Sequence, residues 1–240
     1  GYHKVVNRLN DKEYVNEILR SIKFTLNDGN TVKMYNANTH PTIISHKTTH
    51  LSSDYPGLLC KLDTSKFTMF LSGLMGSNTT FKNEGKDSFD EAYNYAKYLY
   101  ASKILAIDSI NANSINFKEF HFEMNDLGIQ LTEKFKLRNW VYKLIFGKQD
   151  IKVQMLRIGD LLFVSLPVEL SGEYYNKLSV LAEKKNIHLM LTTFNGNYLG
   201  YAPPSEYFHI NHRETREMNW TGKYGGDYFE EIVTKIIEKQ

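Results

Sequence analysis

Residues 151–169 read IKVQMLRIGDLLFVSLPVE, with two apolar stretches on either side of a glycine-aspartate pair. That pair suits a two-residue hairpin turn, so the sequence predicts adjacent strands at 151–158 and 161–166. Pro167 has no amide hydrogen to donate and therefore ends the second strand. Glu169 follows at the carboxyl end of that strand, where functional side chains are common in α/β proteins.

The stretch after Glu169 extends the hairpin into a larger unit. Residues 170–185 are predicted to form a helix, and residues 187–193 a further apolar strand. A strand-helix-strand unit is typical of layered α/β proteins, in which function gathers beyond the carboxyl ends of the strands.

The rest of the chain also alternates between strand-like and helix-like stretches. The predicted fold class is therefore α/β, a layered mixed β-sheet flanked by helices, in one domain without an internal linker. The expected strands are 21–26, 32–37, 67–74 (buried) and 117–124, the first two forming a hairpin that delivers His40 at its end. The expected helices are 11–19, 89–109 (opened by a capping box of Ser88 and Glu91), 140–146 and 227–239, and the expected loops are 76–80 and 195–217.

Composition excludes several classes of protein. The chain has 240 residues and a formal net charge of only +2, with basic residues spread along it, so nucleic acid is not an expected partner. The longest apolar run, 161–168, is far shorter than the roughly 20 residues of a transmembrane helix. One cysteine, Cys60, permits no internal disulfide and no cysteine metal cluster, and it is predicted to lie in the core. Gly1 is neither an initiator methionine nor part of a signal peptide, so a processed or truncated product is expected.

Spacing alone does not define a metal site among the eight histidines. His46 and His50 are four apart, but the threonines and serines around them predict a loop rather than a helix. His209 and His212 lie in a polar loop, where exposure to solvent or a substrate contact is more typical than metal binding. His40, taken alone, is more typical of a structural or hydrogen-bonding histidine.

Four segments, in the same order along the chain, resemble the neutral/alkaline non-lysosomal ceramidase family. They are YNANTHPT at 35–42, FLSGLMGSNT at 70–79, IGDLLFVSLPVE at 158–169 and NGNYLGYAPPSEY at 195–207. The resemblance implies that residues 1–240 form the C-terminal portion of a single neutral-ceramidase-like catalytic domain. It also implies a secreted, periplasmic or cell-surface location.

The resemblance further implies that His40, Glu169 and Tyr201 are ligands of a Zn²⁺ ion. One imidazole, one carboxylate and one phenolate supply donors of the kind that zinc accepts, and their donor atoms are expected within about 5 Å of one another. The implied activity is hydrolysis of the N-acyl amide of a ceramide-like lipid, in sphingolipid metabolism. A zinc ion with an open coordination position would activate water for attack on the amide carbonyl.

The glycine-rich segment departs from the pattern of the family. Thr79 aligns with the family's active-site serine, while Ser77 stands where the family has asparagine or aspartate. Thr79 and Ser77 are both candidate catalytic residues, and Thr79 is expected to lie nearer the metal. A hydroxyl at this place could orient water, stabilise an oxyanion or act as a nucleophile, and the sequence leaves these roles open. Val168 similarly replaces a glycine before Glu169.

Candidate substrate contacts come from the same resemblance. Arg8 resembles a family arginine that holds polar groups of the substrate, although a structural ion pair is an equal alternative. Tyr198 and Tyr207 lie in the tyrosine-rich segment and are further candidates. Asp54 is expected either to orient His40 or to form a structural ion pair. An apolar groove for an acyl chain could be lined by four aromatic residues, unless they are simply core: Tyr198, Phe208, Trp220 and Tyr224.

The family's other zinc histidine comes from a His-x-His segment that these 240 residues lack. An N-terminal fragment or a second chain is therefore expected to complete the site, with a lipid or another N-acyl compound as substrate. Two alternatives stay open: a non-catalytic relative that binds a lipid or glycan, and an amidase that acts on another N-acyl substrate.

Overall fold

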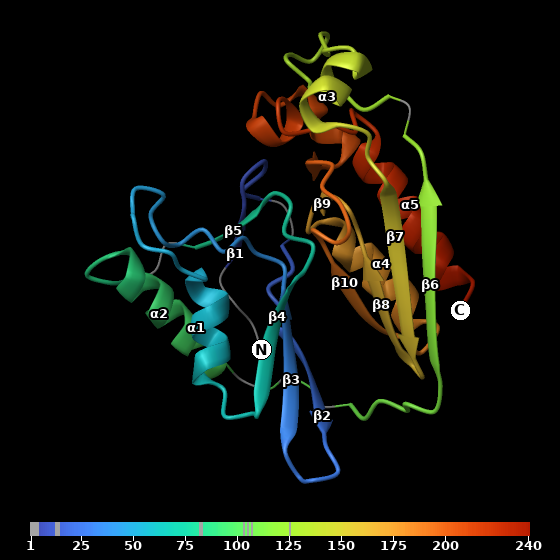
Figure 1. Ribbon diagram of the computed structural model, residues 1–240. Coiled ribbons are helices and arrows are strands. Elements are labelled where there is room, and N and C mark those ends of the chain that lie inside the picture. Colours follow the sequence, from blue (N-terminus) through green and yellow to red (C-terminus); the bar gives the residue numbers. More distant parts are fainter. Residues whose placement is uncertain are drawn as a thin grey trace.

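The computed structural model describes residues 5–12, 15–81, 84–102, 104, 106, 108–124 and 126–240. It confirms the predicted class, a mixed α/β fold in which several sheets are flanked by helices (Figure 1). Among the described residues, no helix is long and apolar enough to span a membrane.

The largest sheet has four strands in the order β10-β8-β7-β6. They are β6 (Ile115–Phe122), β7 (Ile151–Ile158), β8 (Leu161–Ser165) and β10 (His188–Thr192). The predicted hairpin is confirmed, because β7 and β8 are antiparallel and end on the pair Ile158↔Leu161 around a two-residue turn. The strand-helix-strand unit is confirmed as well: β8 and β10 are parallel, and α4 (Tyr174–Glu183) lies between them in the chain.

The second sheet contains β2 (Arg20–Thr25), β3 (Thr31–Ala37) and β4 (Phe67–Ser72) in that order. The predicted hairpin of β2 and β3 is confirmed, and β4 pairs with β3 in parallel through α1 (Asp54–Leu62). The strand expected at 67–74 is confirmed over Phe67–Ser72, but its expected burial is wrong, because the residues of β4 are only half-buried and Phe67 is exposed. Cys60 is also only half-buried, on α1.

Helix α2 (Ser88–Tyr100) packs on α1 through the edge-to-face rings of Tyr55 and Tyr95, whose centroids are 5.0 Å apart. It is shorter than the predicted helix, since the described residues after Tyr100 are not helical. The predicted capping box is also wrong: the carboxylate of Asp87 caps the helix by accepting the amide hydrogens of Phe89 and Asp90. Lys103, Leu105 and Ile107, within the predicted helix, lie outside the described residues.

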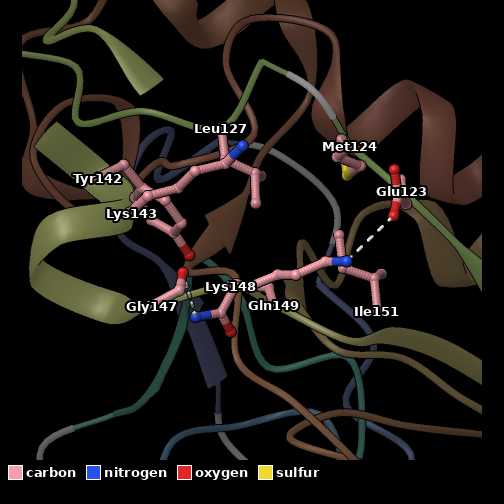
Figure 2. Close-up of a pocket in the computed structure, with 9 residues that line it drawn as sticks. All are labelled: Glu123, Met124, Leu127, Tyr142, Lys143, Gly147, Lys148, Gln149 and Ile151. Carbon is pink, nitrogen blue, oxygen red and sulfur yellow. Dashed lines mark hydrogen bonds and ion pairs between the residues drawn. The ribbon is translucent and has the colours of Figure 1, made fainter. Parts of the chain in front are cut away.

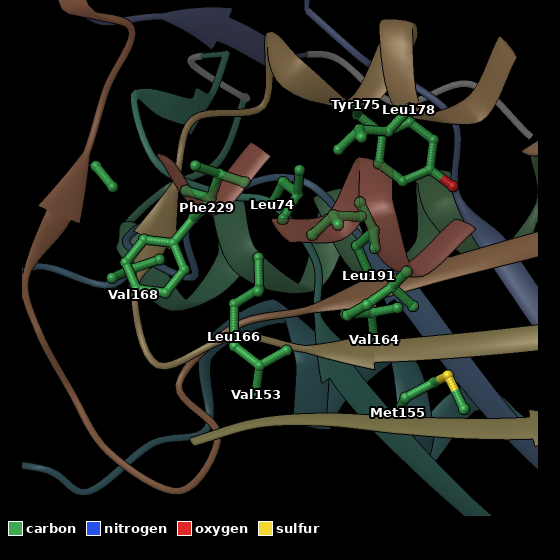
Figure 3. Packing of buried hydrophobic residues seen from close by; sticks show 14 of the residues in the cluster. Leu74, Val153, Met155, Val164, Leu166, Val168, Tyr175, Leu178, Leu191 and Phe229 are labelled. Carbon is green, nitrogen blue, oxygen red and sulfur yellow. The ribbon is translucent and has the colours of Figure 1, made fainter. Parts of the chain in front are cut away.

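The main core lies between the four-stranded sheet and two helices, α4 and α5 (Gly225–Glu238) (Figure 3). Val164 and Leu191 from the strands meet Leu178 of α4 and Phe229 of α5, and all four are completely buried. Each such side chain contributes about 1.5–3 kcal/mol by leaving water. The opposite face of the sheet packs on β2, where Ile22 contacts the core around Leu161 and Met190.

Polar contacts join the two sheets where β4 and β10 end. The side-chain amide of Asn36 donates to the carbonyls of Leu71 and Leu191, at 3.1 Å each. The amide of Thr193 donates to the carbonyl of Ser72 at 3.0 Å. The carboxyl ends of β4 and β10 therefore lie together.

Two short strand pairs complete the region where β4 and β10 end. β1 (Val5–Asn7) pairs with β5 (Asn78–Thr80), and β9 (Glu169–Leu170) pairs with β11 (Tyr201–Ala202). The 76–80 stretch is thus partly strand rather than loop. The 195–217 stretch contains the short helices η1 (Ser205–His209) and η2 (Arg213–Thr215).

Two other helix predictions have opposite outcomes. The helix α3 (Asn139–Phe146) confirms the one expected at 140–146. The helix expected at 11–19 is wrong where it is described, because residues 11 and 12 form a turn and residues 15–19 are not helical. Glu13 and Tyr14 lie outside the described residues.

Candidate functional site

Glu169 and Tyr201 are neighbours across the short parallel pair of β9 and β11, in the register Glu169↔Tyr201. Residues in register on adjacent strands project to the same face of the sheet, so the carboxylate and the phenol lie side by side. Gly200 makes the approach possible. Its φ is +78°, and a Cβ there would meet the carbonyl oxygen of Met218 at 2.1 Å.

His40 reaches the same group from the end of β3. Its Nε2 atom lies 2.5 Å from Oε2 of Glu169 and 3.1 Å from the hydroxyl of Tyr201. The rings of His40 and Tyr201 are stacked with centroids 5.7 Å apart. All three residues are buried. The structure therefore brings the three predicted ligands together from distant parts of the sequence, within the predicted 5 Å along both of these contacts.

A hydrogen bond at Nδ1, on the side of the ring away from Glu169, fixes the orientation of the His40 imidazole. Nδ1 of His40 lies 2.6 Å from the backbone carbonyl oxygen of Asn78, which can only accept a hydrogen bond. Nδ1 therefore carries a proton, and in the neutral ring Nε2 faces Glu169 with its lone pair. The 2.5 Å contact has the length of a hydrogen bond, and the two atoms would have to move apart for both to bind one metal ion at about 2.0–2.2 Å.

The partner that orients His40 was not predicted correctly. Asp54 makes no hydrogen bond to His40; its carboxylate accepts the amide hydrogens of Ile44 and Tyr55 at the start of α1. It thereby fixes the loop that follows His40. Asn78 takes the orienting role through its backbone, and a role of the backbone leaves no signature in the residue type.

Tyr198 supports Glu169 from the other side, because its hydroxyl donates to Oε1 of the carboxylate. Burial and the nearby Glu169 raise the pKa of Tyr198 well above its usual range. Burial, Glu169 and Glu214 likewise raise the pKa of Tyr201, against the opposing effect of Arg8. Both phenols are therefore neutral at physiological pH unless a cation stabilises the phenolate.

Arg8 and Glu214 lie beside Tyr201, as their opposite effects on its pKa show. The guanidinium of Arg8 donates to Oε1 of Glu214 at 3.0 Å. Glu214 is completely buried, and its Oε2 atom has no hydrogen-bond partner within the part of the chain that is described. The pairing of β1 with β5 carries Arg8 here, and its amide donates to the carbonyl of Ser77 at 2.7 Å.

Glu214 is not among the residues predicted from the sequence. It lies in the predicted loop with Glu206 and Glu217, and nothing in the spacing separates it from them. Only the fold shows that η2 turns one of these three carboxylates inward, since Glu214 is the buried one.

The two candidate hydroxyls occupy different environments. Ser77 is buried with a φ of +63°, and its hydroxyl has no hydrogen-bond partner among the described residues. Among residues other than glycine, Asn and Asp tolerate this left-handed backbone best, so Ser77 holds a conformation that serine seldom adopts. Thr79 forms a bridge beside His40, and its hydroxyl is 3.5 Å from that of Thr42. Both residues stay candidates for the catalytic hydroxyl.

Other predicted residues spread over a wider region. Tyr198 packs edge-on against Trp220, with centroids 5.3 Å apart, so part of the aromatic group lies next to Glu169. Tyr207 and Phe208 are buried in η1, while Tyr224 is largely exposed.

The remaining histidine pairs have ordinary local roles. His46 and His50 lie in a loop, as expected. His209 contacts the carbonyl of Glu206, and His212 caps η2. Across the described ranges, no three His, Cys, Asp or Glu side chains form a potential metal site; the third member of the group here is a tyrosine. A surface hollow beneath α3 shares no residue with this group (Figure 2).

Comparisons with known proteins identify the fold. No family model matches the sequence, and no curated protein matches it. The crystal structure of neutral ceramidase from Pseudomonas aeruginosa matches 100% of this chain, with a TM-score of 0.70 and 12% identity. A second structure, ceramidase complexed with C2, matches 99% of the chain, with a TM-score of 0.73 and 10% identity. The chain spans 51% and 52% of the lengths of these two neighbours. The similarity establishes a ceramidase-like fold.

Proposed function

We propose that this chain carries the larger part of a zinc site of an amide hydrolase that cleaves the N-acyl amide of a ceramide-like lipid. The observation that supports it most is the buried convergence of His40, Glu169 and Tyr201. The fold of the structural neighbours, both of them ceramidases, supports the class of substrate.

The chemistry of the donor set fits zinc. Zinc accepts imidazole nitrogen and carboxylate oxygen, and a ligating histidine usually donates its other ring hydrogen to a carbonyl or carboxylate. Asn78 provides that carbonyl for His40, and Tyr198 holds the second oxygen of Glu169. When bound, zinc would polarise the amide carbonyl, make water a stronger nucleophile and favour the phenolate of Tyr201.

The chain's own residues have distinct roles in this proposal. Arg8, held by Glu214, offers donors to polar groups of the substrate or to negative charge that develops on the carbonyl oxygen. Thr79 or Ser77 supplies a hydroxyl beside His40. Tyr198 and Tyr207 are the proposed substrate contacts, with the ring of Trp220 extending the apolar wall next to Tyr198.

The count of ligands supports a contribution from outside these residues. A catalytic zinc needs three or more protein ligands and an open position, and one of the three here is a phenol whose pKa is raised. We propose that a histidine of an N-terminal fragment or of another chain completes the site. Zinc should then bind more weakly to the 240 residues alone than to the completed protein.

Ser77 supports a second candidate, a non-catalytic relative that binds a lipid or glycan. It replaces the amide or carboxylate of the resembled family, and its hydroxyl is buried without a partner among the described residues. An amidase with another N-acyl substrate is a variant of the first proposal.

Zinc titration and fatty-acid release test the proposal together. The purified chain is titrated with zinc against a chelator and assayed on ceramide with and without the N-terminal fragment or chain that is proposed to complete the site. We expect a single zinc site. His40→Ala should abolish zinc binding, and His121→Ala, a control at an exposed histidine, should retain it. Stoichiometric zinc without release from ceramide or other N-acyl compounds would favour the non-catalytic relative. Absence of any His40-dependent zinc binding in the completed protein would refute the metal site.

A further inference from the structure

The region around α3 exposes an unusual number of large apolar side chains. Leu131 and Phe135 are 52% and 69% exposed, and Trp140, Leu144 and Ile145 are 64%, 77% and 57% exposed. We call these five residues, with the intervening basic side chains, the α3 surface. Leaving this much apolar area in water is costly, and such patches mark interaction sites in folded proteins.

An ordered framework holds these side chains outward. Leu131 and Phe135 face each other across a turn, where the amide of Leu131 donates to the carbonyl of Phe135 at 2.9 Å. The turn leads directly into α3, whose Tyr142 is buried and whose Phe146 packs on Trp220 at 4.4 Å. The exposed residues are therefore fixed on a rigid base at one end of the molecule (Figure 1).

The charge of the segment shows what kind of partner fits. Residues 131–148 contain five basic residues and one acidic residue, although the whole chain has a net charge of only +2. Lys136 and Lys148 pair with Asp126 and Glu123, so the positive charge of this surface rests on the other three: Lys134, Arg138 and Lys143. A helix with Trp and Leu on its exposed face and basic residues beside them is typical of segments that bind at the surface of anionic membranes. A symmetric contact with a second copy would instead bring the same basic residues against one another.

The hollow beneath α3 has similar chemistry. Lys143 and Lys148 line it together with Tyr142, and Lys148 pairs with Glu123 at 3.5 Å across one side (Figure 2). The hydroxyl of Tyr142 is buried and has no hydrogen-bond partner among the described residues. Because Glu123 already balances the charge of Lys148, Lys143 is the cation of this lining that suits the phosphate oxygens of a lipid headgroup.

The α3 surface is also close to the candidate site. Trp220 contacts Phe146 of α3 on one side and Tyr198 on the other, with centroid distances of 4.4 and 5.3 Å. Tyr198 in turn donates to Glu169. We infer that the α3 surface docks the protein on an anionic lipid bilayer, with Trp140 and Leu144 inserted at the level of the headgroups. Docking does not depend on the proposed hydrolysis, and its test needs no activity.

The test uses vesicles of phosphatidylcholine with and without 30% phosphatidylserine, and tryptophan fluorescence of the 240-residue protein. The chain has two tryptophans, and Trp220 is buried, so a blue shift on binding should come from Trp140 and disappear in Trp140→Phe. We expect Leu144→Ala/Ile145→Ala to weaken partitioning about tenfold. Lys134→Ser/Arg138→Ser should weaken it about fivefold for each charge, only with phosphatidylserine present.

Matched variants elsewhere provide the controls. Ile115→Ala/Phe117→Ala removes exposed apolar side chains from β6, and Lys23→Ser/Lys118→Ser removes exposed charges from other strands. Both should leave partitioning within about twofold of the unchanged protein. Equal losses in these controls would overturn the proposal, as would absence of vesicle binding. Burial of Trp140 by self-association without vesicles would also overturn it and would identify a second copy as the partner.

Discussion

The candidate site and the α3 surface differ in opposite ways from an ordinary protein: the site buries polar groups, and the α3 surface exposes apolar ones. The site buries a histidine, two carboxylates and the phenol of Tyr201 beside the half-buried Tyr198, and it holds nearly all of their polar atoms in hydrogen bonds. The α3 surface leaves five large apolar side chains in water. Both arrangements cost stability, since buried charges lose hydration and exposed apolar groups order water. The two proposals offer a partner that would offset each cost, a cation in the candidate site and a lipid surface at α3.

The largest effect should come from removing the negative charge of the site. Glu169→Gln keeps the shape of the side chain but leaves one oxygen and a weaker donor set, so zinc affinity should fall at least about 100-fold. Isothermal titration against a chelator measures it. Glu119→Gln, an exposed glutamate on β6, should change zinc affinity less than about twofold. Equal affinities of the Glu169 variant and the unchanged protein would break the assignment of this region.

The buried ion pair should respond asymmetrically to mutation. Arg8→Ala leaves Glu214 fully buried without its hydrogen-bond donor, so the free energy of unfolding should fall by about 3 kcal/mol. Glu214→Ala leaves a guanidinium that reaches solvent and should cost only about 1–2 kcal/mol. Urea unfolding measures both.

The exposed pair of Lys66 and Asp28 provides the contrast, because Lys66→Ala should change stability by less than about 0.5 kcal/mol. Equal losses for the two partners of the buried pair would contradict the burial of Glu214.

Two glycines with the same backbone conformation allow the cost of a positive φ to be measured separately from the cost of a steric clash. Gly29 and Gly200 have φ values of +81° and +78°, but a Cβ at Gly29 has no atom within 4 Å. Gly29→Ala should therefore cost about 1 kcal/mol from the left-handed backbone alone. Gly200→Ala should cost about 1–3 kcal/mol more, because Met218 must move, and it should also displace Tyr201. Thermal unfolding and zinc affinity measured together would show whether the approach of β11 supports the site.

Features that are set by neighbouring residues could be predicted from the sequence more easily than features that depend on distant parts of the chain. The hairpin 151–166 followed from a turn pair and a proline, whereas the convergence of His40, Glu169 and Tyr201 was implied only by the resemblance of short motifs to a known family. The inward turn of Glu214 depends on tertiary contacts that leave no periodic signal, whereas the cap at Asp87 is a local contact that the prediction placed one residue too late, at Ser88. The exposed apolar face of α3 was hidden, because apolar residues in a predicted helix normally indicate core.

The smallest effect concerns the sheet of β2, β3 and β4, away from both regions. Although partial burial opposes it, hydrogen bonds from Ser65, Tyr35 and Lys33 hold the pKa of Asp63 well below its usual range. The lowered pKa stabilises the folded state above the unfolded pKa near 4, and this stabilisation is lost as pH falls through the folded pKa. Asp63→Asn should therefore lose on the order of 1 kcal/mol at pH 6 and flatten the stability profile below pH 4. Unfolding by urea between pH 6 and pH 2 measures the difference, and parallel profiles would contradict it.

The most direct test of the central claim is X-ray absorption at the zinc edge for the zinc-loaded protein and its His40→Ala variant. The account predicts nitrogen and oxygen ligands at about 2.0–2.2 Å, with an imidazole signal that is present in the unchanged protein and reduced in the variant. A spectrum with six equivalent oxygen ligands, or an imidazole signal that the variant leaves unchanged, would show that zinc does not bind where His40, Glu169 and Tyr201 meet.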